Sequence, residues 1–124
     1  MHKSRLAGFI IDCQTGDLQG AADFWSAALG LEQQGVDGEN YIRLDGKPWD
    51  MTLEVQQVDH PSRVHLDVES DDIEAEVSRL EKLGARRLEK IKTWVVMESP
   101  TGQRFCVVKA KVDLTDRPGV RSWK

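Results

Sequence analysis

The chain has few cysteines and no long apolar run. Its 124 residues include only Cys13 and Cys106, too few for a disulfide framework, so we expect reduced thiols and a cytoplasmic protein. No apolar stretch is long enough to span a membrane, which excludes a membrane partner. The basic start (MHKSRLAGFIIDCQTGD) has no adequate apolar core and no small-residue cleavage site, so no signal peptide is expected.

Positive charge is also in short supply. Seventeen Lys and Arg stand against 21 Asp and Glu, for a net charge of -4, and this excludes the basic surface typical of nucleic-acid-binding proteins. A phosphate-binding glycine loop, zinc-type cysteine spacing and a serine-hydrolase elbow are all missing. What remains is a 40% apolar, 31% charged composition, which is typical of a single globular domain that can bury its own core.

Two segments have helical apolar spacing. Residues 17–29 repeat apolar side chains at i, i+3 and i+4, with Asp17 as a helix cap and Gly30 placed to end the helix in a left-handed conformation. Residues 71–83 follow the same spacing, and Asp71 is expected to cap their first turn. The apolar positions are Leu18, Ala21, Ala22, Trp25, Ala28 and Leu29 in the first helix, and Ile73, Val77, Leu80 and Leu83 in the second.

The remaining pattern is that of short strands and turns, and it repeats. Each helix follows one strand and precedes three, which gives the order βαβββ twice over about 55 residues. The fold class predicted is therefore α+β, with two tandem βαβββ modules in a single domain. Strands are expected at 9–13, 32–36, 41–44, 51–55, 63–68, 86–91, 94–98 and 105–109. The modules are expected at about 7–56 and 62–110, followed by a tail at 111–124 that packs on the surface or on a partner.

Two helices can cover only one face of about eight strands. In the strand before the second helix, Val64, Leu66 and Val68 are expected to pack under a helix, and His65 and Asp67 to point to the opposite face. In the strand before the first helix, the same alternation puts Ile10 and Asp12 on that opposite face. Because sheets twist, this second face is expected to bend into a concavity that can hold a ligand.

Three stretches carry a family resemblance that covers about residues 8–109. They are DFWSAALGLE (23–32), RVHLDVESDDIEAEVSRLEKLGA (63–85) and WVVMESPTGQRFCVV (94–108). Together they resemble the vicinal oxygen chelate superfamily of glyoxalase I, bleomycin-resistance proteins and extradiol dioxygenases, and in particular its small bacterial glyoxalase-like domain proteins. The resemblance implies curved mixed sheets that enclose a shared cavity, helices on the outer face, and a homodimer.

The resemblance also implies where a metal would bind. Metal-dependent members hold a divalent ion through side chains of the first and last strands of each module, and by position these are Ile10, Glu54, His65 and Cys106. Ile10 cannot bind a metal, and Cys106 stands where metal-binding members most often have a carboxylate. Glu54 and His65 alone are too few for a tight site, so no metal cofactor is expected. A divalent ion held by these two residues is the less favoured alternative.

Several of these residues have both a chemical and a plain structural interpretation. Glu54 and His65 could form an acid–base pair, or simply be polar groups lining a binding cup. Cys106 could be a nucleophile near His65, but a buried free cysteine usually behaves as a small apolar residue. Trp49 and Trp94 could wall a cavity by stacking on a flat ligand, or pack in the core.

We therefore expect a protein that binds a small, partly apolar organic molecule without metal, as sequestering or resistance proteins do. The alternative is a metal-dependent lyase, isomerase or dioxygenase-like enzyme, related to lactoylglutathione lyase and acting on an oxygenated small molecule. His65 and Glu54 are the catalytic candidates in that case. The residues expected to line the ligand site are Ile10, Glu54, His65, Cys106, Trp49 and Trp94.

Overall fold

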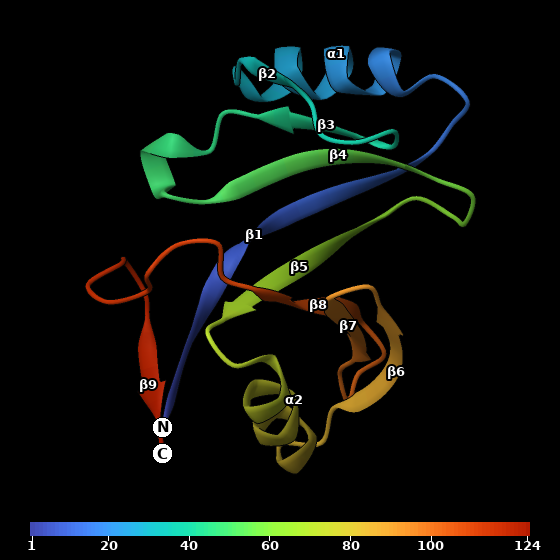
Figure 1. Ribbon diagram of the computed structural model, residues 1–124. Helices are drawn as coiled ribbons and strands as arrows, with labels where there is room; N and C mark the ends of the chain where they lie inside the picture. The colour runs from blue at the N-terminus through green and yellow to red at the C-terminus, as the bar shows by residue number, and fades with distance from the viewer. The chain divides into compact units, whose positions relative to one another are not determined.

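The computed structural model describes all 124 residues as two α-helices and nine strands of a mixed sheet (Figure 1), which confirms the α+β fold class. The helices are α1 (Leu18–Leu29) and α2 (Ile73–Lys82), and a short 3₁₀ helix, η1 (Lys47–Trp49), precedes the fourth strand. The strands are β1 (His2–Gln14), β2 (Gln33–Val36), β3 (Tyr41–Leu44), β4 (Thr52–Val58), β5 (Arg63–Ser70), β6 (Arg86–Ile91), β7 (Trp94–Glu98), β8 (Arg104–Lys109) and β9 (Arg121–Trp123).

The chain divides into two compact units, residues 8–65 and residues 1–7 with 66–124, so β1 and β5 contribute to both. In residues 8–65, β1 pairs in parallel with β4, and β3 pairs antiparallel with β4 and β2. In the other unit, β5 pairs in parallel with β8, and β7 pairs antiparallel with β8 and β6. Each unit thus repeats the pattern of a parallel pair extended by antiparallel strands. The shared cavity and the module boundaries stay predictions.

Helix α1 begins and ends where its sequence predicts. The Asp17 side chain accepts a hydrogen bond from the backbone N–H of Gly20 at 2.9 Å, and Gly30 closes the helix with a φ of 68°. Ala22 is fully buried against the sheet, where α1 packs on β3 and β4. Burial raises the pKa of the Cys13 thiol, although a hydrogen bond with Trp25 opposes this. The Cys13 thiol therefore stays protonated, as a packing group would.

The cap predicted for α2 is wrong by one residue. Asp72 caps the helix by accepting from the backbone N–H of Ala75 at 3.0 Å. The Asp71 carboxylate instead accepts from the backbone N–H of Lys3 on β1 at 2.8 Å. The reason is that β5 runs to Ser70, two residues past its predicted end, which delays the helix. The core of this unit lies beneath α2 and consists of Val77, Val95, Met97 and Val107.

The two ends of the chain hold strands that the sequence pattern did not predict. Strand β1 begins at His2 and not at residue 9, and β9 pairs with it antiparallel, His2 opposite Trp123. The His2 ring donates to the fully buried Glu76 carboxylate at 2.8 Å. The Trp123 indole N–H donates to the Ser4 hydroxyl at 2.8 Å, and the Arg79 guanidinium lies 3.8 Å from the centre of the Trp123 ring.

The prediction that Val64 and Leu66 pack under a helix is also wrong. Val64 is 58% exposed and Leu66 43% exposed. In its own unit, α1 covers β3 and β4, and in the other unit α2 covers β6, β7 and β8. No helix has the length and apolarity needed to cross a membrane.

Candidate functional site

Residues 8–65 contain a ladder of side chains set by the parallel pairing of β1 with β4. Ile10 lies opposite Glu54, and Asp12 lies opposite Gln56. Directly opposed side chains point to the same face of a sheet, as do residues two apart on one strand. Ile10, Glu54, Asp12 and Gln56 therefore share one face, with successive rungs about 7 Å apart.

Asp12 and His65 form a hydrogen-bonded pair on this face. The distance from Asp12 Oδ2 to His65 Nδ1 is 2.9 Å, and the two side chains are only 2% and 14% exposed. Because an ionised carboxylate can only accept, Nδ1 carries the proton of this hydrogen bond. The alternation along β1 predicts Asp12 on the face of His65, although Asp12 is not among the predicted site residues.

An arginine and a second histidine also lie near the Asp12 carboxylate. Arg63 Nε lies 3.7 Å from Asp12 Oδ2, and His60 Nε2 lies 3.8 Å from the same oxygen. The other oxygen, Asp12 Oδ1, is buried and has no hydrogen-bond partner. A buried carboxylate needs both an opposite charge and donors for its oxygens, so Oδ1 is an unused acceptor at the centre of the cluster.

Ile10 and Glu54 are brought together on the neighbouring rung. Glu54 is 10% exposed at its side chain, and its Oε2 lies 4.0 Å from Arg43 Nε across the β3–β4 pair. Ile10 is 2% exposed, so it leaves almost no surface for a ligand. Strand β1 stands between β4 and β5, which separates the backbones of Glu54 and His65 by about 10 Å. Asp12 is an acid that contacts His65, and the acid–base role of Glu54 stays a prediction.

These residues do not fit the four-ligand metal site that the family resemblance implies. Ile10 has no lone pair to donate, and its pairing partner on β4, Glu54, supplies a single carboxylate. Structural and catalytic metal sites in proteins generally use three or four protein ligands.

The other predicted site residues, Trp49, Trp94 and Cys106, belong to η1, β7 and β8. Trp49, on η1, is 54% exposed, which rules out core packing for it. In the unit of residues 1–7 and 66–124, Cys106 is half-buried on β8 and lies opposite Asp67 in the β5–β8 register. Trp94 is half-buried at the start of β7. The roles of these residues as walls of a ligand cavity stay predictions.

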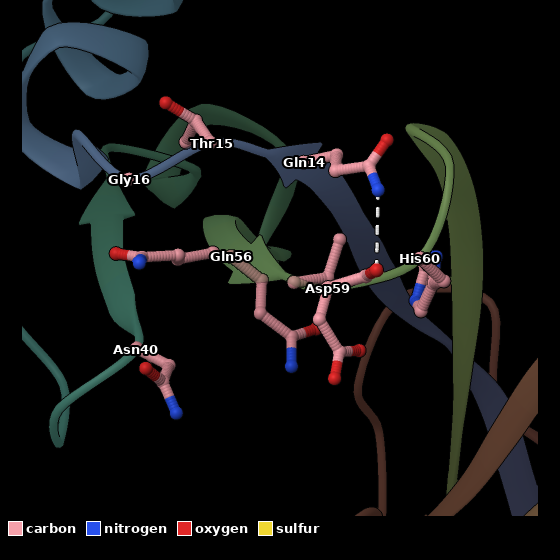
Figure 2. A pocket seen from close by; sticks show the side chains of 9 residues that line it. Gln14, Thr15, Gly16, Asn40, Gln56, Asp59 and His60 are labelled. Atoms are coloured by element: carbon pink, nitrogen blue, oxygen red, sulfur yellow. Dashed lines mark hydrogen bonds between the residues drawn. The ribbon is translucent and has the colours of Figure 1, made fainter.

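Residues 8–65 also contain a cavity of about 790 Å³ that sequence reasoning missed (Figure 2). It lies at the carboxyl ends of β1 and β4, beside the Asp12–His65 pair. Gln56 is the rung partner of Asp12, and His60 contacts the Asp12 carboxylate. None of the six predicted ligand residues lines it. The lining consists of Gln14, Thr15, Gly16, Asn40, Gln56, Gln57, Val58, Asp59 and His60.

Comparison with protein families gives one clear match. The model of the family described as "Glyoxalase-like domain" matches residues 8–108, which is most of the chain and includes the Asp12–His65 pair and the cavity. Among curated proteins, no sequence matched.

Solved structures with a similar fold were also found. A hypothetical protein from Bacillus halodurans is 12% identical, with a TM-score of 0.68 over 89% of this chain and 96% of its own. Streptomyces coelicolor methylmalonyl-CoA epimerase, in complex with 2-nitronate-propionyl-CoA, is 16% identical, with a TM-score of 0.63 over 87% and 98%. Homoprotocatechuate 2,3-dioxygenase from Arthrobacter globiformis is 21% identical, with a TM-score of 0.58 over 85% and 35%. At these identities the likeness concerns the fold alone.

Proposed function

The chain belongs to the glyoxalase-like domain family of the vicinal oxygen chelate superfamily, and on this basis we propose that it binds a small, partly apolar organic molecule. The binding is of the sequestering kind and needs no metal. The site is the face of residues 8–65 that carries Asp12 and His65. The Streptomyces epimerase of similar fold was solved with an acyl-CoA-type ligand, which supports an oxygenated organic molecule as the class of ligand.

The Asp12–His65 pair carries this proposal. Asp12 accepts a hydrogen bond from Nδ1 and so orients the His65 ring, with Nε2 as the ring nitrogen on the side away from Asp12. A hydroxyl or N–H group of the ligand can donate to Nε2. Arg63, with a side chain that is 43% exposed, supplies a positive charge 3.7 Å from Asp12 and can attract a ligand oxygen that bears negative charge.

A thermal-shift and calorimetric screen of oxygenated organic compounds tests the proposal. Metal-free wild-type protein is expected to be stabilised by at least one compound. His65→Ala should abolish the stabilisation, and Glu39→Gln, an exposed control in the same unit, should retain it. Elemental analysis runs in parallel. Stoichiometric metal that disappears in both His65→Ala and Glu54→Gln would contradict the metal-free site.

The same pair favours a second function, an acid–base enzyme. A histidine held by a carboxylate, with Nε2 unprotonated, is placed to remove a proton from a carbon beside a carbonyl group and later to return it. His65 would be the base, Asp12 the positioning residue, and Arg63 the group that faces the negative charge on the substrate oxygen. Proton exchange with D₂O at that carbon of a bound ketone or ester would be lost in His65→Ala. In Asp12→Asn, kcat would fall and KM would change little.

A cytoplasmic homodimer completes the proposal. Five large apolar side chains of residues 8–65 are exposed: Phe24, Leu29, Val36, Trp49 and Val64. Exposed apolar side chains of this size favour burial in an interface between copies. Light scattering of the purified protein should give the mass of a dimer, and Val64→Asp should shift it toward the monomer.

A further inference from the structure

The cavity beside the Asp12–His65 pair is lined largely by polar side chains. Four of its nine residues are primary amides, and Figure 2 shows Gln56 and Asp59 lying between Asn40 and His60. We call it the amide-lined cavity. Its volume of about 790 Å³ is within the range of sites for small molecules. The amide residues are Gln14, Asn40, Gln56 and Gln57.

Most of this hydrogen-bonding capacity is unused within the chain. Each amide side chain offers one carbonyl acceptor and two N–H donors. The side-chain amide of Gln14 donates one hydrogen bond to the backbone carbonyl of Asp59 at 3.1 Å, which holds the Gln14 side chain at the rim of the cavity. The side chains of Asn40 and Gln56 make no hydrogen bond to another residue, although Gln56 is half-buried. These amides are therefore available to a bound molecule.

The charges of the lining narrow the chemistry of that molecule. The cavity contains no lysine or arginine and one carboxylate, Asp59, with His60 at one end. Asp59 disfavours an anionic group inside the cavity, and no lining residue offers a permanent positive charge to pair with one. Amides instead match partners that present donors and acceptors side by side, as adjacent hydroxyl groups and primary carboxamides do.

We propose that the amide-lined cavity binds the uncharged, hydrogen-bond-rich part of the ligand, a polyol or a primary carboxamide. This inference rests on the proposed function, since the adjoining Asp12–His65 pair would hold the rest of the same molecule. Asn40 and Gln56 are the residues that select the uncharged group, and Asp59 accepts one of its hydroxyl or N–H donors.

NMR of the ¹⁵N-labelled full-length chain tests this directly, because side-chain NH₂ signals report on amides one by one. Three probes share one skeleton and differ in charge: glucose, gluconate and glucosamine. Malonamide is the carboxamide probe. We expect glucose or malonamide to shift the NH₂ signals of Asn40 and Gln56, and the stronger of the two identifies which group the cavity prefers. Gluconate should bind more weakly than glucose.

Variants separate a specific site from a general surface effect. Gln56→Leu should raise the dissociation constant of the preferred probe about tenfold, as expected for the loss of one to two hydrogen bonds. Asn40→Leu, in the turn before β3, gives the same readout if Gln56→Leu perturbs β4. Gln19→Leu, an exposed glutamine of α1 outside the cavity, should leave the constant unchanged.

The outcomes distinguish this inference from the proposed function. If a screened organic ligand binds through His65 but neither glucose nor malonamide moves the Asn40 and Gln56 signals, the inference is wrong and the proposed function stands. Binding of gluconate that matches or exceeds that of glucose would also overturn it, as would tighter binding of glucosamine than of glucose in Asp59→Asn, where the carboxylate that attracts a cation is removed. If no organic compound binds the protein, the proposed function itself fails.

Discussion

Removing the charge of Glu76 should destabilise the protein strongly, and in a pH-dependent way. Glu76 is fully buried, which by itself raises the pKa of its carboxyl. Hydrogen bonds from Arg79, His2 and Ser4, together with the Arg79 charge, outweigh burial and lower that pKa from 4.5 to about 2. Both Arg79 contacts are 2.8 Å long, in a two-pronged arrangement.

The magnitude follows from linkage between protonation and folding. The difference between 4.5 and about 2 corresponds to about 3 kcal/mol of unfolding free energy. Since the folded-state pKa of Glu76 is the lower one, this stability is fully present above about pH 5 and is lost as the pH falls toward about 2. Glu76→Gln should therefore be about 3 kcal/mol less stable than wild type near neutral pH, and the difference should narrow on acidification.

Urea denaturation followed by tryptophan fluorescence measures this difference at a series of pH values. The matched control is Glu74→Gln, which removes an exposed carboxylate paired with Arg87 at 3.1 Å. Exposed pairs contribute between about 0 and 1 kcal/mol, so this variant should lie close to wild type. A Glu76→Gln deficit that stays constant from neutral to acidic pH would refute the reasoning, because the loss would then come from packing and not from the carboxylate charge.

Three smaller predictions concern the fold. Gly8→Ala should cost more than about 3 kcal/mol or prevent folding, because a Cβ there would lie 1.7 Å from a β4 backbone oxygen. Gly16→Ala, with nothing within 4 Å, is its control, and equal thermal stability of the two would contradict the prediction. Trp123→Ala should cost about 1–3 kcal/mol in urea denaturation, since it removes a hydrogen bond and the Arg79 stacking contact; an unchanged midpoint would argue against the β9 pairing. Asp17→Ala should cost about 1 kcal/mol by loss of its helix cap, whereas Asp17→Asn should cost much less.

The sequence predicted those elements whose signals are local. Helix α1 has its apolar stripe, Asp17 and Gly30 within 14 residues of one another, and these suffice to place both of its ends. The first seven residues of β1 were missed because they have no apolar alternation. His2 is buried because Glu76, 74 residues away, accepts a hydrogen bond from its ring. No local sequence pattern indicates such a distant partner.

The candidate site likewise has a part that local sequence patterns predicted and a part that depends on the order of the strands. Period-two alternation was enough to put His65, Ile10 and Asp12 on one face, and the family positions drew attention to Glu54. Alternation gives no strand order, however, and the order places β1 between β4 and β5, so that Asp12 contacts His65. The amide-lined cavity was beyond prediction because it forms from turn residues such as Asn40 and Asp59, which become neighbours only after folding.

The parallel pairing of β1 with β4 has a consequence for how this protein can change. Every rung of that ladder presents its two side chains in the same orientation, displaced by a constant step along the strands. A functional group can therefore be relocated along the face by exchanging single residues, with no rebuilding of the backbone. Ile10 beside Glu54 and Asp12 beside Gln56 are two equivalent pairs of positions on the same two strands. Because Ile10 and Asp12 are almost fully buried, an exchanged residue must also fit the space of the side chain that it replaces.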